Sequence, residues 1–346
     1  MAPSNFAASS APSLSVHEGS PTVPAIETVE LRRSFDRVEA VAGVTFQVAG
    51  GETFGFLGPN GAGKSTTISM LCTLLRPTSG SARVAGFDVV AKQMEVRRRI
   101  GLVFQDSTLD EYLTATENLR FHAELYGVPR SQRELRIKRL LQMVGLWDRR
   151  TDIVRTFSGG MKRRLEIARG LLHSHRVLFL DEPTVGLDPQ TRAHIWAYIN
   201  ELKHQEKTTM FLTTHYMDEA EYCDRIAIID NGELVAGGTP EALKAGVGQD
   251  RITMKTGDNA QAQKAIGELF GLSAELADGE LTFQVPGGEE FVPRLFAELG
   301  IPIVSINIAR PTLDDVFISH TGRTIRDAEA SSTDRRRSSP FLRSRR

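Results

Sequence analysis

Residues Gly58 to Ser65 have the composition and spacing of a phosphate-binding loop. They fit the pattern G-x-x-x-x-G-K-[ST], between an apolar strand at Phe54–Leu57 and a helix expected over Thr66–Leu75. Glycines here let backbone N–H groups converge on phosphate oxygens at the positive end of a helix. Lys64 should reach the β- and γ-phosphates, and Ser65 should ligate Mg²⁺. The predicted nucleotide-binding residues of this loop are Gly58, Pro59, Asn60, Gly61, Ala62, Gly63, Lys64, Ser65 and Thr66.

Two adjacent carboxylates follow a second apolar strand. Asp181 and Glu182 come directly after Val177–Leu180 and are followed by Pro183. At the end of such a strand, Asp181 can hold Mg²⁺ through water beside Ser65, and Glu182 is placed to polarise an attacking water. The alternative is a pair of solvated acids that cap a strand. The nearby phosphate loop favours the catalytic interpretation.

A second anion-binding turn lies between the loop and the carboxylates, at Ser158, Gly159 and Gly160. Ser158 is a good N-cap, and the helix expected after it is apolar at Leu165 and Ala168. This turn has no phosphate-loop chemistry of its own. It is useful if it faces a nucleotide that another copy of the domain holds, so that ATP binding closes two domains on each other. The pattern therefore indicates an ATP-driven motor.

Buried strands and helices must position these residues. Continuous apolar runs, such as Thr209–Leu212 and Ile226–Ile229, are typical of a parallel sheet covered on both faces. The stretch of about residues 106–157 is charged and helix-prone, which predicts a helical insertion into an α/β core. We expect this core, with its insertion, to span residues 25–247.

A different pattern begins after Gly246. Strands are expected at Arg251–Lys255, Ser273–Leu276, Leu281–Val285 and Ile303–Ile308, with helices at Ala260–Phe270 and Phe291–Leu299. The order βαββαβ predicts a small ferredoxin-like α+β domain over residues 248–323. Residues 1–24 are rich in Ala, Ser and Pro, and residues 324–346 are rich in Arg and Ser. Both terminal segments are therefore expected to be disordered.

Composition limits the classes of function. The chain has 346 residues, enough for two domains, and a formal net charge of −1, which gives no argument for a nucleic-acid partner. Its two cysteines, Cys72 and Cys223, lie in unrelated segments and are expected to be buried thiols. No apolar run approaches the roughly 18 residues of a membrane-spanning helix. Any membrane process would then be served from the cytosol through a partner.

Taken together, these motifs resemble those of the ATP-binding-cassette (ABC) ATPases over about residues 26–245. In order, the chain carries the phosphate loop, Gln105, the signature Phe157–Met161, Asp181-Glu182, Gly186–Pro189 with Asp188, and His215. The resemblance implies an ATPase with a P-loop core and a helical subdomain, and ATP and Mg²⁺ as its cofactors.

The resemblance also assigns roles. Gln105 would contact Mg²⁺ and the attacking water, and His215 would bind the γ-phosphate and hold that water. With Glu182 and Lys64, these two residues form the predicted catalytic set. Ser65, Gln105 and Asp181 form the predicted metal site.

Further residues would bind the nucleotide. Phe35 would stack on adenine, and Ser158, Gly159 and Gly160 would bind the γ-phosphate held by the opposing subunit. Asp188 would cross the interface toward the partner's loop.

Two departures resemble the daunorubicin-resistance type of multidrug exporter ATPase. The signature begins with Phe157 and ends with Met161, and the C-terminal domain closes with Arg310–Phe317. This implies a peripheral subunit at the cytoplasmic face of the membrane, acting on a separate multi-spanning permease. Homodimer and heterodimer both remain open, and the six intact motifs in one chain favour a homodimer. The exported cargo could be a drug, antibiotic, lipid or glycan. Two alternatives remain, a soluble ABC-type ATPase that acts on ribosomes or nucleic acid, and an import ATPase.

Overall fold

The computed structural model describes residues 23–36, 38–104, 108–172, 175–277 and 279–324. The chain divides into two compact units, one ending at Pro240 and one spanning Glu241–Thr324. The sequence pattern placed this junction at residue 247. Gln105 and all but the innermost residues of the expected terminal segments lie outside the described residues.

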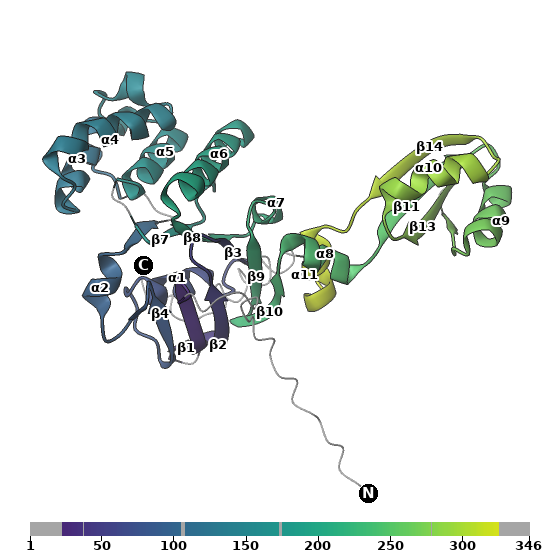
Figure 1. Ribbon diagram of the computed structural model, residues 1–346, viewed down its shortest axis with the longest axis horizontal. Coiled ribbons are helices and arrows are strands. Elements are labelled where there is room, and N and C mark those ends of the chain that lie inside the picture. Colours follow the sequence, from purple (N-terminus) through teal and green to yellow (C-terminus); the bar gives the residue numbers. More distant parts are fainter. Residues whose placement is uncertain (1–22, 37, 105–107, 173–174, 278, 325–346) are drawn as a thin grey trace, which may run out of the picture. The chain divides into compact units, whose positions relative to one another are not determined.

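A six-stranded sheet forms the centre of the first unit (Figure 1). Its order is β10 (Glu233–Gly238), β9 (Arg225–Asp230), β3 (Thr53–Leu57), β8 (Thr209–Thr214), β7 (Val177–Asp181) and β6 (Ile100–Val103). All neighbouring pairs are parallel except β9 with β10. Because parallel strands end at the same edge, the residues that follow β3, β7 and β8 lie together there.

A second, antiparallel sheet packs its apolar face toward the parallel strands. Its order is β2 (Val38–Val48), β1 (Ile26–Phe35), β4 (Ser79–Val84) and β5 (Phe87–Asp88). The ring of Phe46 on β2 lies 5.5 Å from that of Phe54 and 5.9 Å from that of Phe211, which come from the parallel sheet. The sequence pattern predicted these early strands but did not separate them into their own sheet.

Helices complete the first unit. They are α1 (Lys64–Leu71), α2 (Gln93–Arg97), α3 (Ala115–Leu125), α4 (Arg130–Met143), α5 (Gly159–Gly170), α6 (Pro189–Glu206) and α7 (Met217–Ala220), with short 3₁₀ turns at Trp147–Arg149 and Val154–Thr156. A capping box at Thr114 begins α3. One apolar cluster joins α3, α4 and α5, and it runs from Leu109 to Leu172. This helical layer (Figure 1) therefore includes α5 and extends past residue 157, where the insertion was expected to end.

The second unit has the predicted ferredoxin-like topology. Between α8 (Pro240–Val247) and α11 (Leu313–Thr321) lie β11 (Asp250–Thr256), α9 (Asn259–Phe270), β12 (Glu275–Ala277), β13 (Glu280–Val285), α10 (Gly288–Glu298) and β14 (Ile303–Ala309). The sheet order β12-β13-β11-β14 is antiparallel throughout. Ile252, Phe283 and Leu295 are buried in its core. The order of elements is as predicted, although β12 is shorter than the expected strand.

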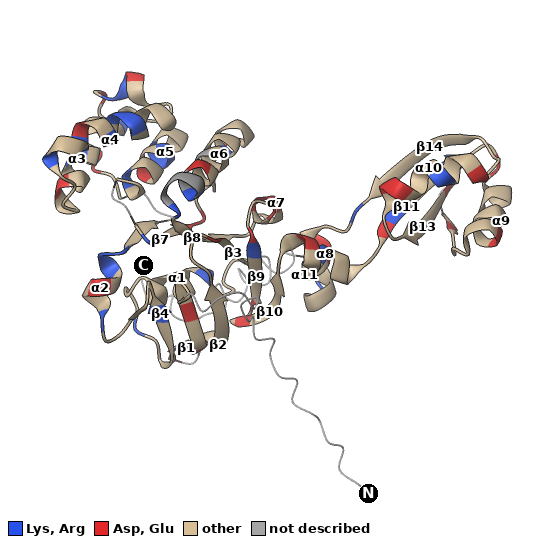
Figure 2. Cartoon of the chain, viewed as in Figure 1, with Lys and Arg blue, Asp and Glu red and all other residues tan. Residues whose placement is uncertain are grey.

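Charged residues of both signs are distributed over both units, and both cysteines are buried. Figure 2 shows acidic and basic residues intermixed along the helices of the first unit and along β11 and α10 of the second. Cys72 and Cys223 are both buried free thiols, as predicted. Among the described residues, the helices include none with the length and apolar character needed to cross a membrane.

Candidate active site

The phosphate loop connects β3 to α1 and requires glycine at two close approaches. A Cβ atom at Gly58 would lie 2.2 Å from the carbonyl oxygen of Ile229, and one at Gly63 would lie 2.5 Å from that of Ala40. Gly63 also has a φ of +110°, in the region that L side chains rarely adopt. The loop therefore holds its backbone against neighbouring strands, and its N–H groups stay available at the start of α1.

Lys64 is the first residue of α1, and its ammonium group turns back over the loop. Its Nζ atom donates hydrogen bonds to the carbonyl oxygens of Gly58 (2.7 Å) and Pro59 (3.2 Å). It also forms an ion pair with Glu182, 3.2 Å from Oε1, and the two side chains are only 3% and 5% exposed. The ammonium group of Lys64 is thus held in a buried ion pair that neutralises its charge.

Asp181 ends β7 and meets two hydroxyl groups. Its Oδ1 atom accepts hydrogen bonds from Thr213 (2.5 Å) and Ser65 (3.3 Å). Burial raises the pKa of the Asp181 carboxyl, and the two hydroxyl groups only partly oppose this shift. A divalent cation would favour the charged form here. The Ser65 hydroxyl and the Asp181 carboxylate are oxygen ligands of the kind that Mg²⁺ takes in small number beside phosphates and water, so the residues present suit this ion.

Glu182 lies one residue further on, in a left-handed backbone conformation with a φ of +47°. Its N–H donates to the Thr213 carbonyl at 3.2 Å, and its Oε1 atom lies 3.2 Å from Nδ1 of His215. Burial raises the pKa of the Glu182 carboxyl, but the hydrogen bond from His215 and the charge of Lys64 together outweigh it and hold that pKa below its usual value. Glu182 is therefore an ionised carboxylate at neutral pH.

The structure thus brings together Lys64, Ser65, Asp181, Glu182 and His215 at the carboxyl edge of the parallel sheet. These residues lie far apart in the sequence. Lys64 and Ser65 follow β3, Asp181 and Glu182 lie at the end of β7, and His215 follows β8, which lies between the other two strands. The resulting cluster can bind phosphate, hold a divalent cation and orient a water molecule.

The signature residues lie elsewhere in the unit, at the beginning of α5. Ser158 caps this helix, since its Oγ atom accepts a hydrogen bond from the N–H of Met161 at 3.3 Å. Ser158 and Gly159 are exposed, and a Cβ atom at Gly159 would meet nothing within 4 Å. The helix end is therefore open to solvent. As predicted, Ser158 is an N-cap residue.

Asp188 and Phe35 are also exposed. Asp188 caps α6 and accepts hydrogen bonds from the N–H (2.9 Å) and hydroxyl (2.6 Å) of Thr191, and these bonds lower the pKa of its carboxyl. Phe35, at the end of β1, is 43% exposed, with the guanidinium of Arg33 4.4 Å from its ring centroid. A flat, accessible ring remains suited to stacking.

Other predicted residues differ in exposure. Asn60 and Gly61 are exposed, whereas Pro59 and Ala62 are buried beneath them, and Thr66 is half-buried. Gln105 cannot be placed because it lies outside the described residues.

Sequence reasoning missed two residues of this site. The Thr213 hydroxyl donates a hydrogen bond to the Asp181 carboxylate. Arg163 on α5 donates to the carbonyl oxygens of Asp181 (3.0 Å) and Glu182 (2.7 Å). Thr213 could have been found from its place beside His215 at a strand end. Arg163 carried no signal of its own, because a charged residue in an amphipathic helix is ordinarily solvated.

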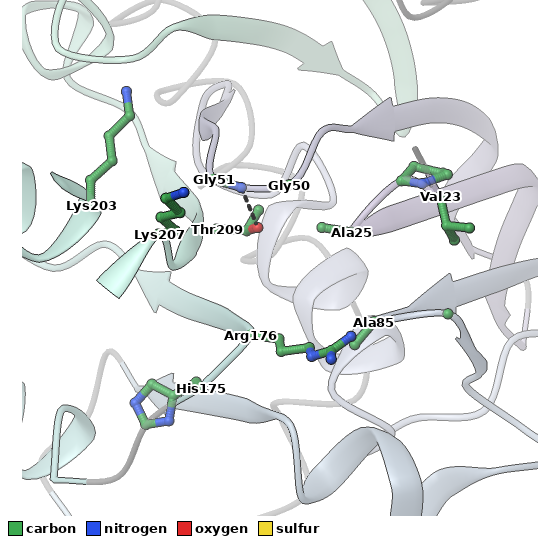
Figure 3. A pocket seen from close by; sticks show the side chains of 12 residues that line it. Val23, Ala25, Gly50, Gly51, Ala85, His175, Arg176, Lys203, Lys207 and Thr209 are labelled. Atoms are coloured by element: carbon green, nitrogen blue, oxygen red, sulfur yellow. Dashed lines mark hydrogen bonds between the residues drawn. The ribbon is translucent and has the colours of Figure 1, made fainter. Parts of the chain in front are cut away.

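A separate cavity of about 660 Å³ lies at the opposite edge of the sheet (Figure 3). It is lined by Gly50, Gly51, His175, Arg176, Lys203, Lys207 and Thr209, among others. Thr209 begins β8 and accepts a hydrogen bond from the N–H of Gly51 at 2.9 Å (Figure 3). The cavity therefore lies at the amino ends of the strands and includes none of the predicted site residues.

Comparisons with known proteins agree with this geometry. Residues 41–185 match the ABC transporter family, and residues 238–321 match the C-terminal domain of DrrA1-3-like ATP-binding proteins. The chain is 39% identical to the linearmycin resistance ATP-binding protein LnrL of Bacillus subtilis (strain 168), over 87% of this chain and 100% of LnrL. It is also 39% identical to the daunorubicin/doxorubicin resistance ATP-binding protein DrrA of Streptomyces peucetius, over 88% of this chain and 94% of DrrA.

Solved structures show the same core. An ATP-binding subunit of an ABC transporter superimposes with a TM-score of 0.60 at 32% identity, over 64% of this chain and 92% of that one. A dimeric, post-hydrolysis structure of the ATP-binding cassette MJ0796, bound to ADP and Pi, gives a TM-score of 0.58 at 25% identity. The match covers 62% of this chain and 98% of that one. The predicted fold and resemblance are confirmed. The chain belongs to the ABC transporter family, as an ATP-hydrolysing, ATP-binding subunit with a DrrA-like C-terminal domain.

Proposed function

We propose that this chain is the ATP-driven motor of an export system. Two copies enclose two ATP–Mg²⁺ between them, and closing and reopening of this dimer drives a separate multi-spanning permease from the cytoplasmic face of the membrane. The observation that carries this proposal is the cluster of the buried Lys64 and Glu182 with the half-buried His215 at the end of the parallel strands.

The ion pair between Lys64 and Glu182 suggests how nucleotide binding prepares hydrolysis. Without nucleotide, each group neutralises the other in a buried position. The phosphates of ATP offer Lys64 a stronger set of charge-assisted hydrogen bonds, which releases Glu182. Glu182 then accepts a hydrogen bond from the attacking water. His215, which is hydrogen-bonded to the Glu182 carboxylate, orients both Glu182 and the water. This divides phosphate binding and water activation between neighbouring residues.

The metal site rests on Ser65 and Asp181. When bound there, Mg²⁺ would neutralise charge that develops on the phosphate oxygens. Thr213 fixes the Asp181 carboxylate through the bond to Oδ1 and leaves a second carboxylate oxygen for water-mediated contact. Gln105 is proposed to complete this site.

Two exposed helix ends support the dimer. The N-terminus of α5 is open to solvent at Ser158 and Gly159, with Gly160 half-buried beside them, and Asp188 at the start of α6 is also exposed. A helix N-terminus attracts phosphate, because its first N–H groups lack partners within the helix. In the proposed dimer, each copy places these residues against the nucleotide of the other. Two of the similar solved structures are described as dimeric, which supports a dimer for this chain.

An apolar patch on the helical layer supports the membrane partner. Tyr112, Phe121, Leu125 and Tyr126 are 79%, 59%, 66% and 50% exposed. Phe121 and Leu125 are four residues apart on α3 and so share one face of the helix. Exposed apolar groups of this kind mark contact sites. We assign the patch to the permease, and the names of the relatives favour export of a drug or antibiotic.

The test is a pull-down from detergent-solubilised native membranes with Glu182→Gln, with and without ATP–Mg²⁺. This variant should bind ATP, lose turnover and form a closed dimer that retains a stoichiometric multi-spanning protein. Glu233→Gln is the matched control, because Glu233 is an exposed glutamate on β10. A monomeric, fully active Glu182→Gln protein would contradict the motor mechanism. Recovery of ribosomal or nucleic-acid material alone would contradict the transport assignment and leave the ATPase.

A further inference from the structure

Arg163 is a buried arginine whose guanidinium group donates to four carbonyl oxygens in two separate segments of the backbone. It is 8% exposed and lies on α5, five residues after Ser158. Its Nε atom donates to the carbonyl oxygen of Pro183 at 2.8 Å, and Nη2 donates to those of Asp181 and Glu182 at 3.0 and 2.7 Å. Nη1 donates to the carbonyl oxygen of Phe104, next to the end of β6.

These contacts fix the backbone that presents Glu182. A glutamate with a φ of +47° is in a left-handed conformation that L side chains rarely adopt and that persists only where surrounding contacts enforce it. Thr213 holds the N–H of Glu182 from the sheet, and Arg163 holds its carbonyl oxygen from the helical layer. The backbone is thus held from both sides. Loss of the second contact would let the peptide after Glu182 rotate.

Arg163 begins a row of buried charged residues along one face of α5. Glu166 and Arg169 follow at intervals of three residues and are 0% and 7% exposed. Glu166 accepts a hydrogen bond from the N–H of Thr108, and Arg169 pairs with Glu166 at 2.8 Å. Phe104 and Thr108 are therefore both attached to α5. The helix is joined to the sheet edge through specific polar contacts rather than through apolar packing alone.

We propose that Arg163 is a positioning residue that aligns Glu182 for hydrolysis and couples the two nucleotide sites of the dimer. This inference rests on the proposed function. In the dimer, Ser158 serves the nucleotide of the partner copy, whereas Glu182 of the same chain serves its own. Five residues of helix separate Ser158 from Arg163 by about 7.5 Å along the axis. Movement of α5 on engagement of one site is thus transmitted to the catalytic carboxylate of the other.

The test compares Arg163→Lys with Arg164→Lys. Lysine keeps the charge, but its single ammonium cannot span the backbone from Phe104 to Pro183. Arg164 is the matched control, because this neighbour on α5 donates instead to the carbonyl oxygen of Val144, at 2.8 Å within the helical layer. ATP hydrolysis is measured against ATP concentration for both variants and for the unmodified protein, and thermal unfolding of each confirms that it is folded.

For Arg163→Lys we expect kcat to fall about tenfold to a hundredfold, the loss typical of a misplaced catalytic group, with KM within about twofold. The Hill coefficient should fall toward 1, since coupling between the two sites is lost. Arg164→Lys should match the unmodified protein. Arg163→Gln, which keeps one amide donor, provides a second variant with the same expected pattern.

A structural role would give a different result. If Arg163 only stabilises the fold, the melting temperature falls while kcat and the Hill coefficient of the folded protein stay unchanged, which overturns the proposal. Failure of both variants to fold would also overturn it. Failure of the motor mechanism itself is recognised separately, by turnover in the Glu182→Gln protein alone.

Discussion

The buried ion pair between Lys64 and Glu182 leads to a quantitative prediction for the nucleotide-free protein. With 3.2 Å between Nζ and Oε1, an effective dielectric constant of about 20 gives an attraction of about 5 kcal/mol before desolvation. Removing one member of a buried pair usually costs about 3–5 kcal/mol. Here each group keeps other partners, His215 for Glu182 and loop carbonyls for Lys64. We therefore expect Lys64→Met and Glu182→Gln each to lower the free energy of unfolding by about 2–3 kcal/mol.

A double-mutant cycle isolates the pair. Lys64→Met combined with Glu182→Gln should cost about as much as one substitution alone, which corresponds to an interaction energy of about 2–3 kcal/mol. Urea unfolding at pH 7 without nucleotide, followed by tryptophan fluorescence, suits this measurement. Both tryptophans of the chain, Trp147 and Trp196, belong to the first unit, so the signal reports the unit that contains the pair.

Two results would refute the reasoning. Additive costs in the cycle would mean that the pair makes no net contribution. The second result concerns pH. Because the folded pKa of Glu182 is below its usual value, its stabilisation is complete above the unfolded pKa and is lost as pH falls through the folded pKa. The difference in unfolding free energy between the unmodified protein and Glu182→Gln should therefore shrink below about pH 4. A constant difference would contradict the assignment.

Two further predictions follow from burial. Gly58→Ala places a Cβ atom 2.2 Å from the Ile229 carbonyl oxygen and should weaken ATP binding at least tenfold, measured by fluorescent-nucleotide titration; Gly246→Ala, with nothing within 4 Å, should leave it unchanged, and equal affinities would contradict the tight-approach argument. Burial, aided by the charge of Arg169, lowers the pKa of His122 to about 4, so the folded state binds fewer protons and loses stability as pH falls from about 6.5 toward 4. His122→Gln should lose less unfolding free energy than the unmodified protein between pH 7 and pH 5 in urea titrations, and an identical loss would show that His122 does not contribute.

Much of the fold follows from local patterns in the sequence. The β-turn-α context of the phosphate loop and the apolar runs of β7 and β9 require a parallel α/β core, and the βαββαβ order of the second unit is equally local. The separate antiparallel sheet was not predicted, because alternation in β2 indicates a strand but not the strand with which it pairs. The extension of the helical layer into α5 was missed for the same reason. The apolar pattern that includes Leu165 and Leu172 predicts a buried helix face, but it does not say which of the two cores that face joins.

The sequence by itself determined which residues carry chemistry: glycines where backbone must approach phosphate, a lysine and a serine that follow them, and carboxylates and a histidine at strand ends. Their convergence follows from parallel pairing, since adjacent parallel strands end at one edge. Only the tertiary structure decided the nucleotide-free pairing of Lys64 with Glu182 and the contact between Arg163 and the Glu182 carbonyl. These contacts join segments more than a hundred residues apart in one case and two different layers in the other. Hydrogen-bond geometry and burial, which fix them, are properties of the packed chain and leave no pattern in the spacing of its residues.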